Sequence, residues 1–348
     1  MTLERLKPNA WRVLLAGLAL AGAGAAGAQP TVALYGRIDA ALQLKSKTGT
    51  AKQGLQVNSG GLNMSRWGLR GSEDLGGGLK ANVQLESGFS ADTGEVRGAS
   101  NLFSRMAFVS VSGGLGTVSA GLQWTPYDNG FPDALEYTNA SAMLAAFFPG
   151  AHGDKGNTGW GNAKNSLQYA TPTLGGFNAT FMAAPGEDGG PGLSASRYTG
   201  MGLFYKAGPV YASLALESSK QVGTGAPTNA WILGGSYKLD AVTLFAAVER
   251  ARNKTLNGGE DAGWSVGASV PLGADTTLAA SHAQESTSQA TGSVVNADRR
   301  ALGLRLVNHL SKRTNVYAAY LRTHTTLVAG SPSPSISSTL SLGLRHNF

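Results

Sequence analysis

The side chains that most often carry catalysis or bind metals are sparse in this sequence and poorly spaced for either task. There is no cysteine, which excludes thiolate metal sites, cysteine nucleophiles and disulfides. The five histidines, at positions 152, 282, 309, 324 and 346, do not have the spacing of metal ligands. Ser281 and His282 are neighbours, but adjacent residues of a strand point to opposite faces and cannot form a nucleophile–base pair. The sequence therefore predicts no enzymatic activity, no metal site and no cofactor.

Two glycine-rich stretches match parts of phosphate-binding loops without the context that such loops need. Residues 22–27 read G-x-G-x-x-G, but no strand precedes them and no helix follows. Residues 76–80 lack the Lys-Ser/Thr ending, and a hairpin turn explains their glycines better. The net charge of +7 comes without a dense Lys/Arg cluster interleaved with aromatics, which disfavours nucleic acid as a partner.

The N-terminal segment has the three parts of a secretory signal peptide. Arg5, Lys7 and Arg12 form the positive region, residues 13–25 are apolar, and residues 26–28 form an A-x-A cleavage site. The apolar run is short for a membrane-spanning helix. We therefore expect residues 1–28 to be removed on export, which leaves residues 29–348 as one domain.

The mature chain alternates between apolar and polar residues in short stretches. Examples lie at residues 80–86, 177–183, 210–217 and 264–270. Each of these stretches has one apolar face and one small or polar face, which is the pattern of a half-buried strand. No segment after the N-terminus approaches the ~20 apolar residues of a transmembrane helix.

Turn motifs separate the predicted strands at regular intervals. Their centres lie near residues 75, 114, 175, 208, 240, 273 and 312, and longer loops rich in Gly, Ser, Thr and Asn lie between them. Short turns on one side and long loops on the other are typical of outer-membrane barrels. Seven turns and two terminal strands predict sixteen strands and eight loops, of which the third, residues 125–162, is the longest.

A closed transmembrane barrel explains this pattern better than a soluble β-sandwich. In lipid every backbone N–H and C=O must be paired, so a spanning sheet must have no edges. Leu340, Leu342, Leu344, His346 and Phe348 keep the alternation to the last residue, whereas the chain ends of soluble domains usually fray. The predicted fold is all-β, a transmembrane antiparallel β-barrel with short periplasmic turns and long extracellular loops. The aromatics expected in its interfacial girdles include Trp124, Tyr205, Trp231, Tyr237 and Tyr317.

Six segments, in this order along the chain, resemble the trimeric porins of Gram-negative bacteria, especially the β-proteobacterial type. They are residues 34–40 (LYGRIDA), 65–76 (SRWGLRGSEDLG), 85–89 (LESGF), 104–109 (SRMAFV), 165–169 (NSLQY) and 343–348 (GLRHNF). The resemblance implies a sixteen-stranded barrel, a homotrimer and a third loop folded into the lumen. It also implies a location in the outer-membrane lipid and assembly by the outer-membrane machinery, with Phe348 as the recognition signal.

Porins of this type carry basic side chains on the wall that faces the third loop. The matching positions here are Arg37, Arg66, Arg105 and Lys164. A lipid-facing Arg near the membrane midplane costs about 2–4 kcal/mol, so Arg37 and Arg66 should face water. Lys164 lies on the polar face of its predicted strand. Arg105 shares its face with Ala107 and Val109, which makes its direction ambiguous, and we expect it to point inward.

The third loop of such porins usually supplies acids to the opposite side of the pore. Here Asp128, Asp133 and Glu136 are the candidate pore acids and Asp154 lies further along the loop, but two usual acidic positions at its tip fall on Asn139 and near Ala146. An apolar run at residues 143–148 favours an inward fold, because exposing each large side chain would cost roughly 1.5–3 kcal/mol. A basic wall opposite a loop that is short of acids predicts a constriction that prefers anions.

We therefore expect a general diffusion porin that passes small hydrophilic solutes and ions with weak anion selectivity. The alternative is a substrate-specific channel, or a surface-binding, adhesin-like barrel whose loops dock a partner. A specific channel needs a continuous ladder of aromatic or charged residues, whereas the basic residues here cluster at one level of the wall.

Overall fold

The chain is described by a computed structural model, in which residues 31–48, 54–97, 101–131, 161–186, 197–220, 227–253, 259–289, 297–327 and 334–348 are placed. The predicted signal peptide and most of the third loop lie outside these residues. The described part is almost entirely β-structure, with one short 3-10 helix, η1 (Asp128–Gly130). Within it, no helix is long and apolar enough to cross a membrane.

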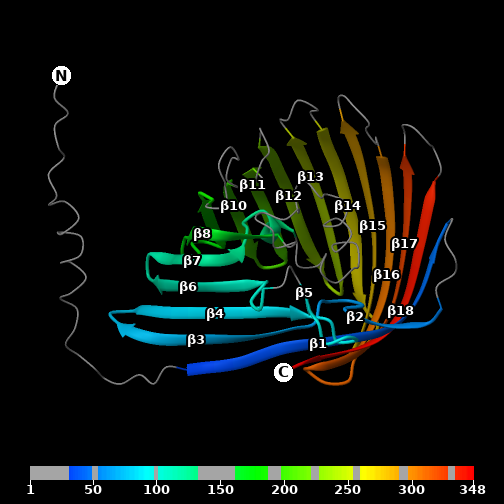
Figure 1. Cartoon of the computed structure of the whole chain (residues 1–348), viewed down its shortest axis with the longest axis horizontal. Coiled ribbons are helices and arrows are strands. Elements are labelled where there is room, and N and C mark those ends of the chain that lie inside the picture. The colour runs from blue at the N-terminus through cyan, green and yellow to red at the C-terminus, as the bar shows by residue number, and fades with distance from the viewer. Residues whose placement is uncertain are drawn as a thin grey trace.

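Every strand pairs antiparallel with its neighbours, and the sheet closes through β1 and β18, which lie side by side in Figure 1. The strands are β1 (Thr31–Lys47), β2 (Gln56–Ser59), β3 (Arg66–Gly76), β4 (Leu79–Phe89), β5 (Val96–Arg97), β6 (Met106–Gly113), β7 (Gly116–Trp124), β8 (Asn162–Ala170), β9 (Phe177–Ala184), β10 (Arg197–Ala207), β11 (Val210–Lys220), β12 (Thr228–Leu239), β13 (Val242–Asn253), β14 (Gly259–Pro271), β15 (Thr276–Gln289), β16 (Ala297–His309), β17 (Thr314–Leu327) and β18 (Ser335–Asn347).

The two shortest strands are parts of longer barrel strands. β1 pairs with β3 through residues 31–37 and with β2 through residues 40–43, so β2 and β3 are two halves of one strand. β4 likewise pairs with β6 and, further along, with β5. Because the sheet has 18 strands in all, counting each of these two pairs once gives the predicted sixteen-stranded barrel.

The turns lie where the sequence predicted them. They join β3 to β4, β6 to β7, β8 to β9, β10 to β11, β12 to β13, β14 to β15, and β16 to β17. In the first of them Gly76, Gly77 and Gly78 all have positive φ, a conformation that only glycine adopts readily. Because neighbouring strands are antiparallel, these turns share one end of the barrel and the longer connections share the other.

The alternation sorts side chains between the outer surface and the lumen. On β1 the outward Leu34, Ile38 and Leu42 are 61%, 43% and 45% exposed, whereas the inward Asp39 and Ala41 are buried. An outer apolar band of this kind matches the hydrocarbon layer of a membrane.

Tyr317 departs from the expected girdle. Tyr317 faces the lumen, packs with Ala41 and Leu62, and donates its O–H to Asp39. The girdle prediction is therefore wrong for Tyr317, because the polar end of its ring reaches a buried carboxylate instead of the membrane interface. Trp231 and Tyr237 do lie on the outer face.

Candidate functional site

One barrel strand is interrupted between β2 and β3, and the inserted residues 60–65 stand opposite only residues 38 and 39 of β1. The carboxylate of Asp39, which is fully buried, accepts the backbone N–H groups of residues 61, 62 and 63 at 3.2, 3.1 and 2.8 Å. Leu62 is buried against Tyr317 and Ala41 of the inner wall. Asp39 thus replaces the strand partners that these backbone donors have lost, and it holds the insertion on the lumen side.

A second interruption, between β5 and β6, positions Arg105. This residue lies directly before β6, and its Nε donates to Oε1 of Glu86 at 2.7 Å. Its guanidinium also lies over the ring of Trp124, 5.0 Å from the ring centroid. In a regular strand residues 105 and 109 would share one face, and Val109 points outward. Arg105 precedes the regular strand, so its side chain reaches the inward-facing Glu86.

Glu86, on β4, joins two strands of the wall. Nε of Arg66 lies 3.4 Å from Oε2 of Glu86, and the O–H of Tyr35 donates to the same oxygen at 3.0 Å. The side chain of Glu86 is only 3% exposed, whereas that of Arg66 is 27% exposed. The carboxylate is therefore covered, while the guanidinium of Arg66 remains accessible from the lumen.

Two further arginines extend this cluster. Arg37 is the direct cross-strand partner of Arg66, and its Nε donates to Oδ1 of Asn347 at 2.7 Å. Arg70 stacks on Tyr35, with Cζ 4.7 Å from the ring centroid. Sequence reasoning missed Arg70 and Glu86, although Arg70 has the strand parity of Arg66 and Glu86 lies on the polar face of residues 80–86. Arg37, Arg66, Arg70, Arg105 and Glu86 are called the arginine group below.

Lys164 does not follow the alternation that was used to place it. Asn165 has a φ of 55°, and residues 164 and 165 stand opposite a single residue of β7. Such a β-bulge changes the face of the residues that precede it, so Ala163 and Ser166 are both buried. The structure brings Arg37, Arg66 and Arg105 together. Lys164 lies beside this bulge on β8, two residues after Asn162, whose side-chain amide donates to the carbonyl oxygen of Arg105.

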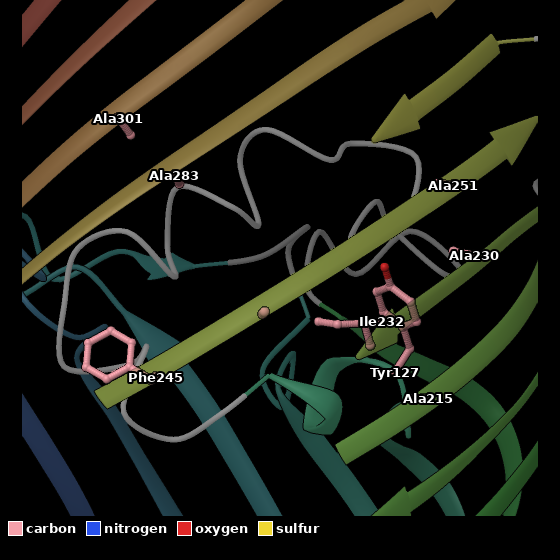
Figure 2. Close-up of a cluster of buried hydrophobic side chains, with 9 residues drawn as sticks. Tyr127, Ala215, Ala230, Ile232, Phe245, Ala251, Ala283 and Ala301 are labelled. Carbon is pink, nitrogen blue, oxygen red and sulfur yellow. The ribbon is translucent and has the colours of Figure 1, made fainter. Parts of the chain in front are cut away.

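The described start of the third loop lies against the inner wall. η1 contacts β10, β11 and β12, and Tyr127 packs beside Ile232 and Ala215, as Figure 2 shows. The O–H of Tyr127 donates to Oε2 of Glu249 at 2.7 Å, and Ser213 donates to the carbonyl oxygen of Gly130. Burial, and then the charge of Glu249, raises the pKa of Tyr127 well above its ordinary value, so the phenol stays protonated.

Of the three predicted loop acids, Asp128 is the one that the structure describes. It lies in η1, close enough to Arg105 for its negative charge to act on the guanidinium. Asp133 and Glu136 lie outside the described residues. The wall that receives the loop also carries buried acids that sequence reasoning did not single out: Glu217, Glu249 and Glu285.

Comparison with known sequences places the chain among porins. Residues 14–326 match the family model of the Gram-negative porin. The chain is 32% identical over 312 residues to outer membrane porin protein 32 of Delftia acidovorans, covering 87% of each chain. It is 30% identical over 404 residues to an outer membrane porin protein of Bordetella pertussis, covering 97% of this chain and 100% of that one.

Solved structures agree with this assignment. An anion-selective porin from Comamonas acidovorans superposes with a TM-score of 0.75 at 28% identity, covering 92% of this chain and 100% of that one. An outer membrane protein of Vibrio cholerae has a TM-score of 0.69 at 14% identity, which shows a shared fold alone. The closed sixteen-stranded barrel and these relatives together show that the chain belongs to the Gram-negative porin family and is an outer-membrane channel protein.

Proposed function

We propose that this chain is a general diffusion porin with a weak preference for anions, and that the arginine group sets this preference. The observation that carries the proposal is the composition of that group, four arginines against one buried carboxylate. Fields are screened over about 8 Å at physiological salt, so a narrow passage lies within the field of its own wall. Low-dielectric walls focus that field and raise the local concentration of the opposite ion.

The opposite wall weakens this field less than its acid content suggests. Glu249 is buried and accepts a hydrogen bond from Tyr127, and Glu285 is buried and lies 3.0 Å from Nη1 of Arg299. The similarity to a porin from Comamonas acidovorans that is itself anion-selective also supports the proposal.

The test replaces arginines that are not needed to neutralise Glu86. Arg37→Gln with Arg66→Gln removes two positive charges, while Arg105 still pairs with Glu86 at 2.7 Å. The reversal potential of the double variant in a KCl gradient across a planar bilayer should shift toward cation preference. The control is Arg300→Gln with Arg322→Gln, and both of these arginines are exposed. Leu302 is the cross-strand partner of Arg322 and shares its face of β16 with Arg300, and it points outward. An unshifted double variant, or an equal shift in the control, would contradict the proposal.

The general character of the channel has its own test. A channel with a specific binding site is blocked by its solute at low concentration, whereas a diffusion pore is not. We expect the conductance in KCl to stay unchanged when millimolar sugars, small dicarboxylates or phosphate are added. Concentration-dependent block by one of these solutes would favour the substrate-specific alternative.

We also propose that the mature protein starts at Gln29, is exported through its signal peptide and assembles as a homotrimer. The A-x-A motif at residues 26–28 supports the first point. A Vibrio cholerae outer membrane protein of the same fold, 16% identical, has been solved in a trimer form, which supports the last. N-terminal sequencing of protein extracted from outer membranes tests the cleavage site. Light scattering in detergent, corrected for bound detergent, tests for a mass of three chains.

A further inference from the structure

The insertion at residues 60–65 brings a methionine sulfur into the lumen, next to the arginine group. Met64 is partly exposed, and Nη1 of Arg105 donates to its Sδ at 3.3 Å. The same guanidinium donates through Nε to Oε1 of Glu86 at 2.7 Å. A thioether sulfur is a weak hydrogen-bond acceptor, so this contact adds little stability beside the ion pair. Its effect is to fix the sulfur at the arginine group.

The wall makes room for this sulfur at Gly88, on β4. A Cβ added to Gly88 would lie 3.1 Å from Sδ of Met64, 3.3 Å from Cδ of Arg105 and 3.6 Å from Cβ of Arg97. The first of these distances is tighter than most real contacts of a Cβ, so a larger residue at position 88 would displace the sulfur. The sulfur thus lies against a glycine of the wall, with two arginines beside it.

The described ranges contain four methionines, whose sulfur atoms have different surroundings. Met182 is 4% exposed and therefore shielded from solutes, and Met201 is 41% exposed on the outer face. Met106 faces the lumen and stands directly opposite Glu86 in the β4–β6 pair. Within these ranges, Met64 is the methionine that combines partial exposure with a hydrogen bond from an arginine to its sulfur.

We propose that Met64 is an oxidation site for hypochlorous acid and hypochlorite, and that its sulfoxide lowers both the conductance and the anion preference of the channel. Hypochlorite is a small hydrophilic anion, which a diffusion pore admits. Because the arginine group attracts anions under the proposed function, on which this inference rests, it raises the local concentration of hypochlorite. The field that draws in passing anions thus brings this oxidant to the sulfur.

The reaction needs no reactant besides the oxidant and water. A sulfur lone pair attacks the chlorine of hypochlorous acid, and the O–Cl bond breaks with release of hydroxide. Water then adds to the chlorosulfonium sulfur, so that an S–O bond forms as the S–Cl bond breaks, and chloride and two protons leave. One of these protons neutralises the hydroxide. In sum, the sulfur gains one oxygen atom and becomes a sulfoxide, while chlorine takes up two electrons and ends as chloride.

The sulfoxide changes the wall in two ways. Its oxygen is a stronger acceptor than the thioether sulfur, so it competes with Glu86 for the N–H groups of Arg105. The negative end of the S–O dipole then lies among the arginines and weakens the field that attracts anions. The added oxygen also takes volume from the lumen beside the insertion. Both effects slow the further entry of the oxidant.

The test treats the folded mature protein in detergent with hypochlorite at neutral pH, at increasing ratios of oxidant to protein. Peptide mass spectrometry measures the sulfoxide at each methionine, and planar bilayers measure conductance and reversal potential. Met64 should be oxidised at a lower dose than Met106 and Met182. The conductance should fall, and the reversal potential in a KCl gradient should move toward zero, in step with the sulfoxide at Met64. Because the protein is folded before the oxidant is added, misfolding cannot produce this loss.

Two substitutions at position 64 separate the sulfur from the rest of the protein. Met64→Leu keeps the approximate volume without the sulfur, so its channel should conduct normally and should resist the same dose of oxidant. Met64→Gln supplies an oxygen acceptor in place of the sulfur, so it should lower the conductance and the anion preference without any oxidant. Met106→Leu is the matched control, because it removes a second lumen methionine and should stay as sensitive as the unmodified protein.

Oxidation of Met106 or Met182 before Met64 would overturn the proposal. A Met64→Leu channel that loses conductance at the same dose would overturn it too, as would complete oxidation of Met64 with unchanged conductance, or a Met64→Gln channel that behaves like the unmodified one. An unmodified channel without anion preference would contradict the proposed function instead. The dose at which Met64 is oxidised and the accompanying fall in conductance are read independently of that preference.

Discussion

Asp39 and Glu86 show how single carboxylates organise the lumen of this barrel. Each is buried, and each binds groups from more than one strand: Asp39 holds backbone N–H groups and Tyr317, and Glu86 holds Arg66, Arg105 and Tyr35. A buried charge with several hydrogen-bond donors around it is tolerated, whereas the same charge alone is costly. These two acids are therefore best understood as parts of the wall that position other groups.

Replacing Asp39 by Ala should both destabilise the barrel and widen the pore. Hydrogen bonds to charged groups contribute about 1.5–3 kcal/mol each, and the variant removes those to residues 61–63 at 2.8–3.2 Å. Once released, the insertion no longer narrows the lumen, so single-channel conductance should rise and the unfolding temperature in detergent should fall.

The control for this experiment is Asp74→Ala. Asp74 is an exposed acid near the end of β3 that accepts a local hydrogen bond from the backbone N–H of Gly76 at 2.8 Å. The single-channel conductance of Asp74→Ala should match that of the unmodified protein. If Asp39→Ala folds and also conducts normally, the insertion at residues 60–65 does not narrow the pore.

At the scale of elements, the pair β1–β18 is where the barrel closes. Gly36 and Phe348 exchange two backbone hydrogen bonds of 3.0 and 3.1 Å. A Cβ added to Gly36 would lie 2.3 Å from Cζ of Phe348, so the terminal ring occupies the place of the missing side chain. This packing offers a structural role for Phe348 beside its predicted role as an assembly signal.

Gly36→Ala separates these two roles, because it disturbs the packing of the ring while leaving Phe348 in the chain. If the closure depends on that packing, Gly36→Ala should reduce the amount of folded protein in outer membranes about as much as Phe348→Ala does. Gly54→Ala is the control, since nothing lies within 4 Å of its added Cβ. Normal amounts of Gly36→Ala together with low amounts of Phe348→Ala would leave only the recognition role. The readout is the fraction of heat-modifiable, folded protein on a gel.

The described start of the third loop is a second element, and the contact of Tyr127 with Glu249 is one of its anchors. Tyr127→Phe keeps the ring but leaves the buried Glu249 without the O–H that now lies 2.7 Å away, at a cost of about 1–3 kcal/mol. We expect more open-channel noise in planar bilayers as the loop loses an anchor. Tyr211→Phe is the matched control, because the hydrogen bond that its exposed O–H donates to the carbonyl oxygen of Asn129 is long, at 3.4 Å. Equal noise in both variants would argue against the anchor.

The pH dependence of this anchor follows from the raised pKa of Tyr127. A tyrosine whose folded pKa is raised stabilises the fold fully below its ordinary value of roughly 10, and loses that contribution as the pH rises toward the folded pKa. The low open-channel noise of the unmodified protein should therefore persist from neutral pH up to roughly pH 10.

At the scale of the whole molecule, the barrel separates an apolar outer surface from a charged lumen. The inner charges are unevenly placed, with the arginine group on β1, β3 and the start of β6 and buried acids on β11, β13 and β15. Such an arrangement puts a transverse field across the pore, and on the arginine side Arg66, with 27% of its side chain exposed, offers its charge to a passing ion. The channel as a whole, rather than a single residue, thus determines its selectivity.

Because this selectivity is electrostatic, salt should weaken it. The Debye length falls from about 10 Å at 0.1 M to about 3 Å at 1 M ionic strength. We expect the anion preference, measured as a reversal potential at a constant KCl ratio, to fade as both concentrations rise. A preference that stays constant over this range would indicate direct ion binding in place of a screened field.

The sequence alone determined the strands, the turns and the closed barrel. These follow from local chemistry: alternation with period two assigns each side chain to lipid or lumen, and glycine-rich motifs such as residues 76–78 form turns wherever they occur. The inward direction of Arg37 and Arg66 also follows from local chemistry, since neither side chain is tolerated in the hydrocarbon layer.

Only the tertiary structure decided which lumen residues share a partner. The interruptions beside β3 and β6, and the bulge at Asn165, break the alternation at the positions where Arg105 and Lys164 had to be placed. Tyr317 lies 278 residues from Asp39 in sequence, yet its hydroxyl completes the carboxylate's set of donors. Contacts of this kind depend on the closure of the sheet and on the backbone groups that its interruptions leave unpaired, and no local pattern encodes either of them.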